Sequence, residues 1–340
     1  MRLAGALAAA AIAAGCAGGA SAGEDELRSY LEEEAGRGFS GAVLVLNEGR
    51  RLVDQGYGLA DRERRIPIQR DTVFELGSIT KVFTAATVMR LAEEGRLRLD
   101  DRLPRFFRDV PRSKRSITVR QLLAHRSGLP EYPGYGDLVW ISRGRSMRNA
   151  LDLPLRFRPG TRTAYSNVGY TVLAAIVEVA SGERFERAMR RRVFAPAGMS
   201  QTGFFGERLW PPERVAIGYE GLSVGARNAP DARRGVSWSF KGAGGVVGPT
   251  GDLERWAAAV WAGRIIRRAS VPLLYRLAVG PPPPGRGPYA YAGGNAFGFN
   301  ATVAELPDDQ ALVVVLSNSS PPGAARAEVI ERRLVDLLRT

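Results

Sequence analysis

The chain has 340 residues, 45% of them hydrophobic and 24% charged, values that fit a globular protein and exclude a disordered chain or a coiled coil. Its formal net charge is +13, and because only Lys81, Lys114 and Lys241 are lysines, arginine supplies most of it. No nucleic-acid-binding motif accompanies the arginines, so we attribute the charge to the solvated surface and expect no nucleic-acid partner. With one cysteine, Cys16, and one histidine, His125, the sequence excludes an intramolecular disulfide and a zinc site built from Cys and His.

Residues 1–22 have the pattern of a secretory signal with a short tether. Met1 and Arg2 precede an apolar run over residues 3–14, which is shorter than the roughly 20 residues that span a bilayer. Two processing sites fit this segment. Ala14-Gly15-Cys16 resembles a bacterial lipobox and would place a lipid on Cys16, whereas Ala20-Ser21-Ala22 fits ordinary signal cleavage. We favour the lipid anchor at Cys16, and with either site we expect a protein outside the cytoplasm, periplasmic, secreted or anchored to the bacterial membrane.

The first predicted elements are a β-hairpin and three helices. The hairpin joins residues 39–46 and 51–58 through Asn47-Glu48-Gly49-Arg50. A helix follows over about 78–94 and stops at Gly95. Thr118 and Gln121 have capping-box spacing, which predicts a short helix ending before Gly128. Residues 167–180 show helical periodicity closed by Gly182.

The C-terminal third is predicted to return to strands. A short helix over 252–261 and a proline-rich loop over 281–287 precede three strands, at 289–297, 301–306 and 311–318, and a last helix at 324–338. Strands near both ends with helices between them predict an α/β (α+β) fold, with one antiparallel sheet built from both termini. We expect a single domain over 23–340, with a sheet lobe at about 36–92 and 240–340 and a helical lobe at about 93–239.

Ser78-Ile79-Thr80-Lys81 is the central motif. A separation of three places Ser78 and Lys81 on one helix face, one turn apart. Ser78 follows Gly77 at the expected helix N-terminus, where free N–H groups favour developing negative charge. The flanking residues are mostly apolar, so we expect Lys81 to be buried; burial lowers a lysine pKa, and a neutral lysine can take the proton of a serine hydroxyl.

Tyr165-Ser166-Asn167 leads into a predicted helix and supplies further polar groups. A tyrosine near a lysine ammonium can have its phenol pKa lowered and act as an acid or a base. Asn167 offers an amide to a substrate carbonyl or to Lys81. A packed tyrosine and an asparagine N-cap are the structural alternatives for these two residues.

Five segments in order carry a family resemblance: residues 74–85 around Ser78, residues 122–130 around His125, Phe157-Arg-Pro-Gly-Thr161 with Tyr165-Ser-Asn-Val-Gly-Tyr170, Pro196-Ala-Gly-Met199 with Thr202 and Phe204, and residues 244–253. Together they resemble the penicillin-binding proteins, class C β-lactamases and related esterases, from about residue 39 to the C-terminus. The resemblance implies that Ser78 is the acylated nucleophile, Lys81 its partner, Tyr165 the acid–base group and Asn167 a substrate or lysine contact. It implies a β-lactamase/transpeptidase-like fold with the site between sheet and helical lobe, and it gives His125 a role in loop structure.

The match departs from the family at the strand expected to line the site. Members usually carry Lys-Thr-Gly or His-x-Gly there, whereas this chain has Ala292-Gly293-Gly294. Tyr291-Ala-Gly-Gly294 instead resembles the Trp-Gly-Gly of the family's carboxylesterases, those of family VIII. Glycine permits close backbone approach, and an N–H near Asn295 would complete an oxyanion hole with that of Ser78. We therefore expect Gly293, Gly294 and Asn295 to bind substrate.

These residues predict acyl transfer to water by a monomeric serine hydrolase that needs no metal or organic cofactor. The missing cation favours an ester or small amide as substrate, in an enzyme of the esterase or D-amino-acid peptidase type, over efficient β-lactam turnover. The expected partner is a small-molecule or peptidoglycan-like substrate in the cell envelope. Two alternatives stay open: a β-lactamase with weak turnover, and a non-catalytic lipoprotein that binds a cell-wall ligand.

Overall fold

The computed structural model describes residues 22–136, 139–219, 227–228, 235–280, 289–296, 298–319 and 326–339. Cys16 and the proline-rich loop predicted at 281–287 lie outside the described residues. No helix in the described ranges is both long enough and apolar enough to cross a membrane.

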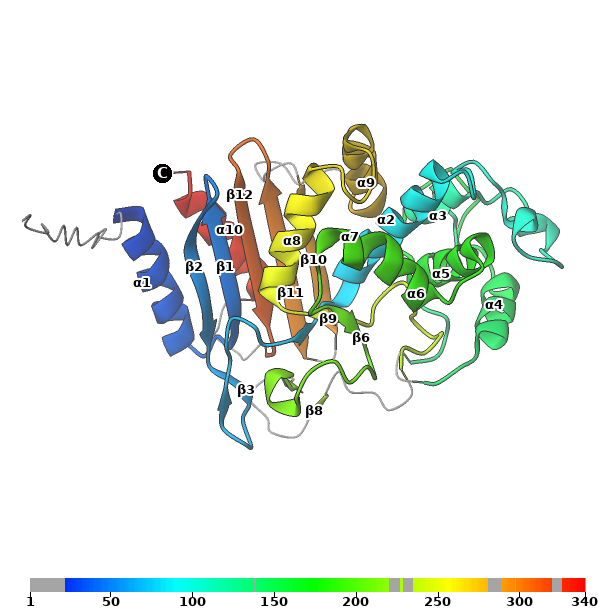
Figure 1. The fold of residues 1–340 in the computed structure, drawn as a ribbon. Coiled ribbons are helices and arrows are strands. Elements are labelled where there is room, and N and C mark those ends of the chain that lie inside the picture. The colour runs from blue at the N-terminus through cyan, green and yellow to red at the C-terminus, as the bar shows by residue number, and fades with distance from the viewer. Residues whose placement is uncertain are drawn as a thin grey trace, which may run out of the picture.

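A five-stranded antiparallel sheet forms one side of the molecule, with the order β10-β11-β12-β1-β2 (Figure 1). Its central pairing joins β1 to β12, from Gly41 opposite Ser317 to Leu46 opposite Leu312. The predicted sheet built from both ends of the chain, including the hairpin of β1 and β2, is therefore confirmed. The strands are β1 (Gly41–Asn47), β2 (Arg50–Tyr57), β10 (Tyr289–Ala296), β11 (Phe299–Leu306) and β12 (Ala311–Ser317).

Both faces of this sheet are covered. Successive residues of a strand point to opposite faces, so Val43 and Val45 pack with Leu27 and Leu31 on one side, while Ala42 and Leu44 join the main core on the other. Helices α1 (Ala22–Gly36) and α10 (Ala327–Leu337) lie against the first face, and α8 (Thr250–Trp261) lies against the second (Figure 1). Helix α1 was not predicted from the sequence.

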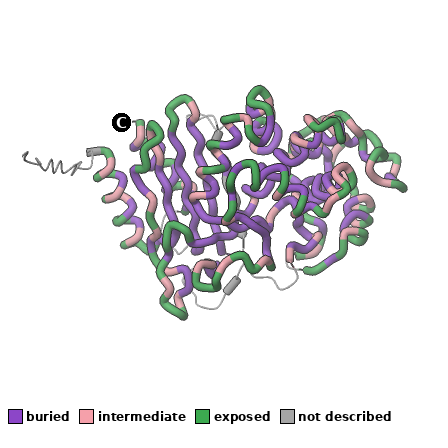
Figure 2. Tube along the Cα trace, viewed as in Figure 1, coloured by how far each residue is buried: buried purple, intermediate pink, exposed green. Residues whose placement is uncertain are grey.

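Helix α2 (Thr80–Glu93) is the central element of the main core. It is buried along nearly its whole length (Figure 2) and packs against α5 (Asn167–Ser181) and α9 (Val271–Ala278). Its threonines bury their hydroxyl groups without loss because Thr84 and Thr87 donate to backbone carbonyls one turn earlier, at 3.1 and 2.8 Å. The side chains of the first turn of α2 are therefore fixed in position and shielded from solvent.

The predicted helix boundaries follow local capping chemistry. Thr118 and Gln121 form the expected capping box at the start of α3 (Val119–Leu123), and Gly182 ends α5 in a left-handed conformation. The other helical elements are α4 (Arg143–Asp152), α6 (Phe185–Met189), the π-helical turn η4 (Arg190–Phe194), α7 (Ala195–Ala197), η1 (Gly77–Ile79), η2 (Leu103–Arg105), η3 (Arg112–Lys114), η5 (Pro212–Arg214) and η6 (Arg268–Ser270).

Short strands connect the sheet to the helical part. A three-stranded sheet with the order β5-β9-β6 brings the segment before Ser78 beside residues 246–248. These and the other short strands are β3 (Leu59–Asp61), β4 (Ile66–Pro67), β5 (Phe74–Glu75), β6 (Gly203–Phe204), β7 (Gly218–Tyr219), β8 (Arg227–Asn228) and β9 (Val246–Gly248).

Candidate active site

Ser78 lies where strand β5 turns into helix α2. Gly77 takes a φ of 53° in this turn, a left-handed conformation that glycine adopts without a Cβ clash. The buried Glu75 carboxylate fixes the turn because it accepts the Gly77 N–H at 2.6 Å and the Gly245 N–H at 3.3 Å. Sequence analysis placed Ser78 correctly at the helix start but missed Glu75, since nothing local marks a carboxylate that binds a segment 170 residues away.

Lys81 reaches Ser78 from one helical turn further along, as predicted. Its Nζ donates to Ser78 Oγ at 2.9 Å and to the Ala243 carbonyl at 2.8 Å. The residue is 2% exposed, and Nζ lies over the rings of Tyr165 and Tyr170, 4.8 and 5.7 Å from their centroids. Lys81 is thus held against the nucleophile by a carbonyl and two aromatic faces.

Tyr165 completes the group. Its hydroxyl lies 2.6 Å from Ser78 Oγ, so Ser78 has hydrogen-bond contacts with both Lys81 and Tyr165. Although 40% of the residue is exposed, burial of the phenol raises its pKa to about 12; the Ser78 hydrogen bond lowers it and the Glu131 carboxylate raises it further. The lowered pKa expected from the sequence is wrong in direction, because desolvation outweighs the other effects.

Asn167 begins helix α5, two residues after Tyr165. The N-cap of this helix is Ser166, whose hydroxyl accepts the Gly169 N–H at 2.9 Å, so Asn167 does not serve as the cap. Its backbone N–H donates to the Glu131 carbonyl at 3.0 Å.

His125 contacts Tyr165 and the backbone of the residue that follows it. Its ring stacks on Tyr165 and packs against Tyr170, while Nδ1 accepts the Ser166 N–H at 3.1 Å. Burial and the Lys81 charge lower its pKa to about 4, so the ring is neutral at pH 7. Its Nε2 is buried without a partner among the described residues.

Strand β10 lies beside η1, so the predicted segment Ala292-Gly293-Gly294 belongs to a strand that adjoins the turn carrying Ser78. Gly293 pairs with Ala301 and Ala296 with Phe299, and the register is irregular between them, which leaves Gly294 and Asn295 outside regular pairing. The preceding Tyr291 anchors the strand, since its hydroxyl bonds the buried Glu305 carboxylate at 2.6 Å. Glu305 also accepts from Tyr275 at 2.7 Å and Trp261 at 2.6 Å, a network that the sequence did not reveal.

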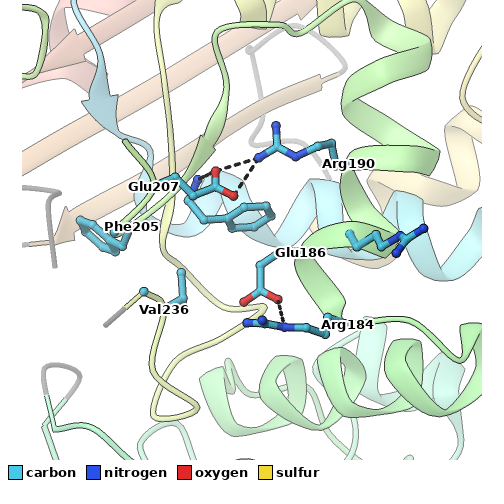
Figure 3. A pocket seen from close by; sticks show the side chains of 10 residues that line it. Arg184, Glu186, Arg190, Phe205, Glu207 and Val236 are labelled. Carbon is cyan, nitrogen blue, oxygen red and sulfur yellow. Dashed lines mark hydrogen bonds and ion pairs between the residues drawn. The ribbon is translucent and has the colours of Figure 1, made fainter. Parts of the chain in front are cut away.

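A separate pocket of about 360 Å³ lies between α6, β6 and the segment around Val236 (Figure 3). Ion pairs surround it: Arg190 bonds both carboxylate oxygens of Glu207, and Glu186 pairs with Lys241 and lies 3.9 Å from Arg184. Ser78, Lys81 and Tyr165 do not line this pocket. Its charged side chains join α6 to neighbouring segments.

Comparisons with known proteins agree with this geometry. The family model described as Beta-lactamase matches residues 27–337. Penicillin-binding protein 4* of Bacillus subtilis (strain 168) is 32% identical over 249 residues, which cover 68% of this chain and 54% of that protein. The putative penicillin-binding protein PbpX of the same strain is 28% identical over 254 residues, covering 74% and 61%. The chain thus spans little more than half the length of these curated relatives.

Two solved structures extend the likeness to the fold. The octameric penicillin-binding protein homologue from Pyrococcus abyssi has a TM-score of 0.76 and 25% identity, covering 93% of this chain and 77% of that one. SurE, solved with D-Leu, has a TM-score of 0.74 and 27% identity, covering 93% and 76%.

Proposed function

Because this chain belongs to the beta-lactamase family of serine hydrolases, we propose that it hydrolyses an ester or a small amide through an acyl-enzyme on Ser78. The observation that supports the proposal most directly is the arrangement at Ser78, where Oγ lies 2.9 Å from Lys81 Nζ and 2.6 Å from the Tyr165 hydroxyl. A nucleophile within hydrogen-bond reach of a base and of a second proton-transfer group is the minimal equipment for acyl transfer.

The proton roles follow from the surroundings of each group. Lys81, in its neutral form, takes the Ser78 proton as Oγ attacks the substrate carbonyl. Tyr165, whose pKa of about 12 keeps it protonated, gives a proton to the leaving group. Water then attacks the acyl-enzyme and releases the acid, with the same two groups acting in reverse.

Backbone N–H groups are the proposed oxyanion hole. The Ser78 N–H lies at the start of the first helical turn and has no hydrogen-bond partner among the described residues. The irregular segment between Gly293 and Ala296 supplies the second N–H in this proposal, since it adjoins η1. Gly293, Gly294 and Asn295 keep the substrate-binding role expected of them as part of the same proposal.

The residue composition of strand β10 favours esters and small amides as substrates over lactams that carry a carboxylate. No Lys, Arg or His occurs between Tyr289 and Ala296, so this strand offers no cation to a substrate carboxylate. The neighbour solved with D-Leu, at 27% identity, is the reason to keep amino-acid-derived amides beside esters. Action in the cell envelope, with Cys16 as anchor, remains part of the proposal.

The test compares p-nitrophenyl butyrate hydrolysis by the protein and by its Ser78→Ala variant, with fluorophosphonate labelling of both. We expect activity and label in the wild-type protein, and neither in the variant. Activity that survives in Ser78→Ala would exclude Ser78 as the nucleophile. A wild-type protein with neither activity nor label would favour the non-catalytic ligand-binding alternative.

A further inference from the structure

All three lysines of the chain are buried, although lysine is rare among its cations. Of the 48 lysine and arginine residues only Lys81, Lys114 and Lys241 are lysines, and their exposed fractions are 2, 3 and 4%. A guanidinium carries five donors in a rigid fork, whereas an ammonium is a compact group that suits a buried site with few acceptors. The mechanism proposed for Ser78 uses Lys81 and leaves the buried Lys241 without a role.

Lys241 begins a turn that has almost no other side chains. The residues that follow it, 242–245, are glycine, alanine and two glycines, and a glycine-rich backbone is conformationally permissive. Yet the Ala243 carbonyl in this turn accepts a hydrogen bond from Lys81 Nζ at 2.8 Å. A turn of this composition needs an anchor if that carbonyl is to stay in one place.

The side chain of Lys241 is anchored on helix α6. Its Nζ donates to the Glu186 carboxylate and lies 5.1 Å from the centroid of the Trp238 ring. Glu186 belongs to α6, where it also lines the pocket shown in Figure 3. Helix α6 packs against α2, the helix that carries Lys81. The ion pair therefore fixes the turn to the same group of helices that holds Lys81.

The other contacts of the turn come from its backbone. The Gly242 carbonyl accepts the Thr84 hydroxyl at 2.8 Å, and the Gly245 N–H donates to Glu75 at 3.3 Å. The contact between Lys241 and Glu186 carries a charge on both partners, and such contacts are roughly twice as strong as neutral hydrogen bonds. A shift of the turn would move the carbonyl that Lys81 contacts.

We propose that Lys241 is a positioning residue for the reaction at Ser78. Its ion pair with Glu186 holds the Ala243 carbonyl where that carbonyl accepts from Lys81. The same contact keeps Lys81 Nζ within reach of Ser78 Oγ, 2.9 Å away. This inference rests on the proposed function of Ser78. Because Lys241 acts through the turn and not on the substrate, its loss should slow the chemical steps and leave substrate binding nearly unchanged.

The experiment measures p-nitrophenyl butyrate kinetics, the rate of fluorophosphonate labelling and thermal unfolding. The variants are Lys241→Met, which keeps an unbranched side chain and removes the charge, and Glu186→Gln/Lys241→Met, which leaves no unpaired charge. Lys114→Met is the matched control. It removes the other buried lysine outside the proposed mechanism, whose Nζ donates to the Leu151 carbonyl at 2.7 Å in the helical part of the molecule.

We expect Lys241→Met to lower kcat and the labelling rate about tenfold or more, with KM changed less than twofold, since small misplacements of catalytic groups slow the reaction. The Tm should fall as well, because Glu186 loses its partner. The double variant should recover much of the Tm but neither rate, which separates positioning from stability. Lys114→Met should lower the Tm and keep both rates within twofold of wild type.

Two outcomes would overturn the inference while leaving the proposed function standing. One is a double variant with wild-type kcat and labelling rate. The other is a Lys114→Met variant that loses as much kcat as Lys241→Met at a temperature where both are folded. If Lys241→Met does not fold, the double variant and Glu186→Gln decide by the same two rates. A wild-type protein that neither cleaves the ester nor takes the label would overturn the proposed function, and the inference with it.

Discussion

The ring of His125 stacks on the ring of Tyr165, with centroids 4.7 Å apart and planes inclined by 29°. His125 takes a left-handed φ of 55°, and its Nδ1 accepts the N–H of the residue that follows Tyr165. The only histidine in the sequence therefore acts on the site through another residue. It is a positioning residue for the phenol and does not itself reach Ser78.

His125→Asn should separate stacking from backbone support. Asparagine tolerates a left-handed φ and offers an oxygen to the Ser166 N–H, but it cannot stack on Tyr165. We expect near-native folding and a fall in kcat/KM for p-nitrophenyl butyrate of about tenfold or more, since small misplacements of catalytic groups are costly. Circular dichroism with steady-state kinetics checks this, and an unchanged kcat/KM would show that the stack has no positioning role.

His125 should also make the fold sensitive to acid. The pKa of His125 is lowered from 6.5 to about 4 in the folded protein. The His125 ring therefore takes up a proton near pH 6.5 in the unfolded chain, but in the folded chain it stays neutral until about pH 4. The free energy of unfolding should therefore fall by about 3 kcal/mol between pH 6.5 and pH 4, and His125 should add no further loss below that. Urea denaturation at pH 7, 5.5 and 4 measures the slope. His125→Asn should show a shallower decline, and parallel curves for the two proteins would contradict the assignment.

Tyr165→Phe should affect substrates according to their leaving groups. A phenol with a pKa of about 12 is a proton donor at neutral pH. An anilide leaves only with a proton, whereas p-nitrophenolate leaves without one. We expect kcat/KM to fall by about 10²–10⁴ for alanine p-nitroanilide, and by clearly less for p-nitrophenyl butyrate. Equal losses on the two substrates would indicate that Tyr165 serves attack by Ser78 and not departure of the leaving group.

Gly128→Ala should destabilise the loop that carries His125. Gly128 has a φ of 80°, and a Cβ there would collide with the Phe157 carbonyl oxygen. Gly95 is a matched control, because it has a φ of 73° and an added Cβ meets nothing within 4 Å. We expect Gly95→Ala to cost about 1 kcal/mol, from backbone strain alone, and Gly128→Ala about 2 kcal/mol more, from the clash. Urea titration of both variants gives the difference, and equal losses would mean that the Phe157 segment moves aside freely.

Elements with a local signal were predictable from the sequence. The capping box at Thr118, the stop at Gly182 and the apolar runs of the terminal strands each depend on residues close in the chain, and all three are present. Helix α1 was missed because its apolar residues are few within a highly charged segment: Leu27 and Leu31 are buried, and Tyr30 and Ala35 are partly buried beside them. Its position is set by the surface of the sheet and not by its own pattern.

In the candidate site, too, the contacts between residues close in the chain were predictable and the long-range contacts were not. Ser78 and Lys81 share a helix face at a separation that the sequence shows, and they are in contact. The Ala243 carbonyl that accepts from Lys81 is 162 residues away, and the hydrogen bond between Glu75 and the Gly245 N–H joins residues 170 apart. Neither contact leaves a local pattern in the sequence. The direction of the Tyr165 pKa was also out of reach, because it depends on how completely the fold removes water from the phenol.

The pairing of β1 with β12 has a consequence for how the protein matures. The central strand pair of the sheet cannot form until residue 317 has been made and has reached residue 41, and contacts this distant in sequence form slowly. Until then the hairpin of β1 and β2 exposes an unsatisfied edge, and the segment that carries Ser78 lacks β10 beside it. A growing or truncated chain that ends before β12 would therefore be both prone to aggregation and without hydrolytic capacity, so that the nucleophile becomes competent only when almost the entire polypeptide has been made.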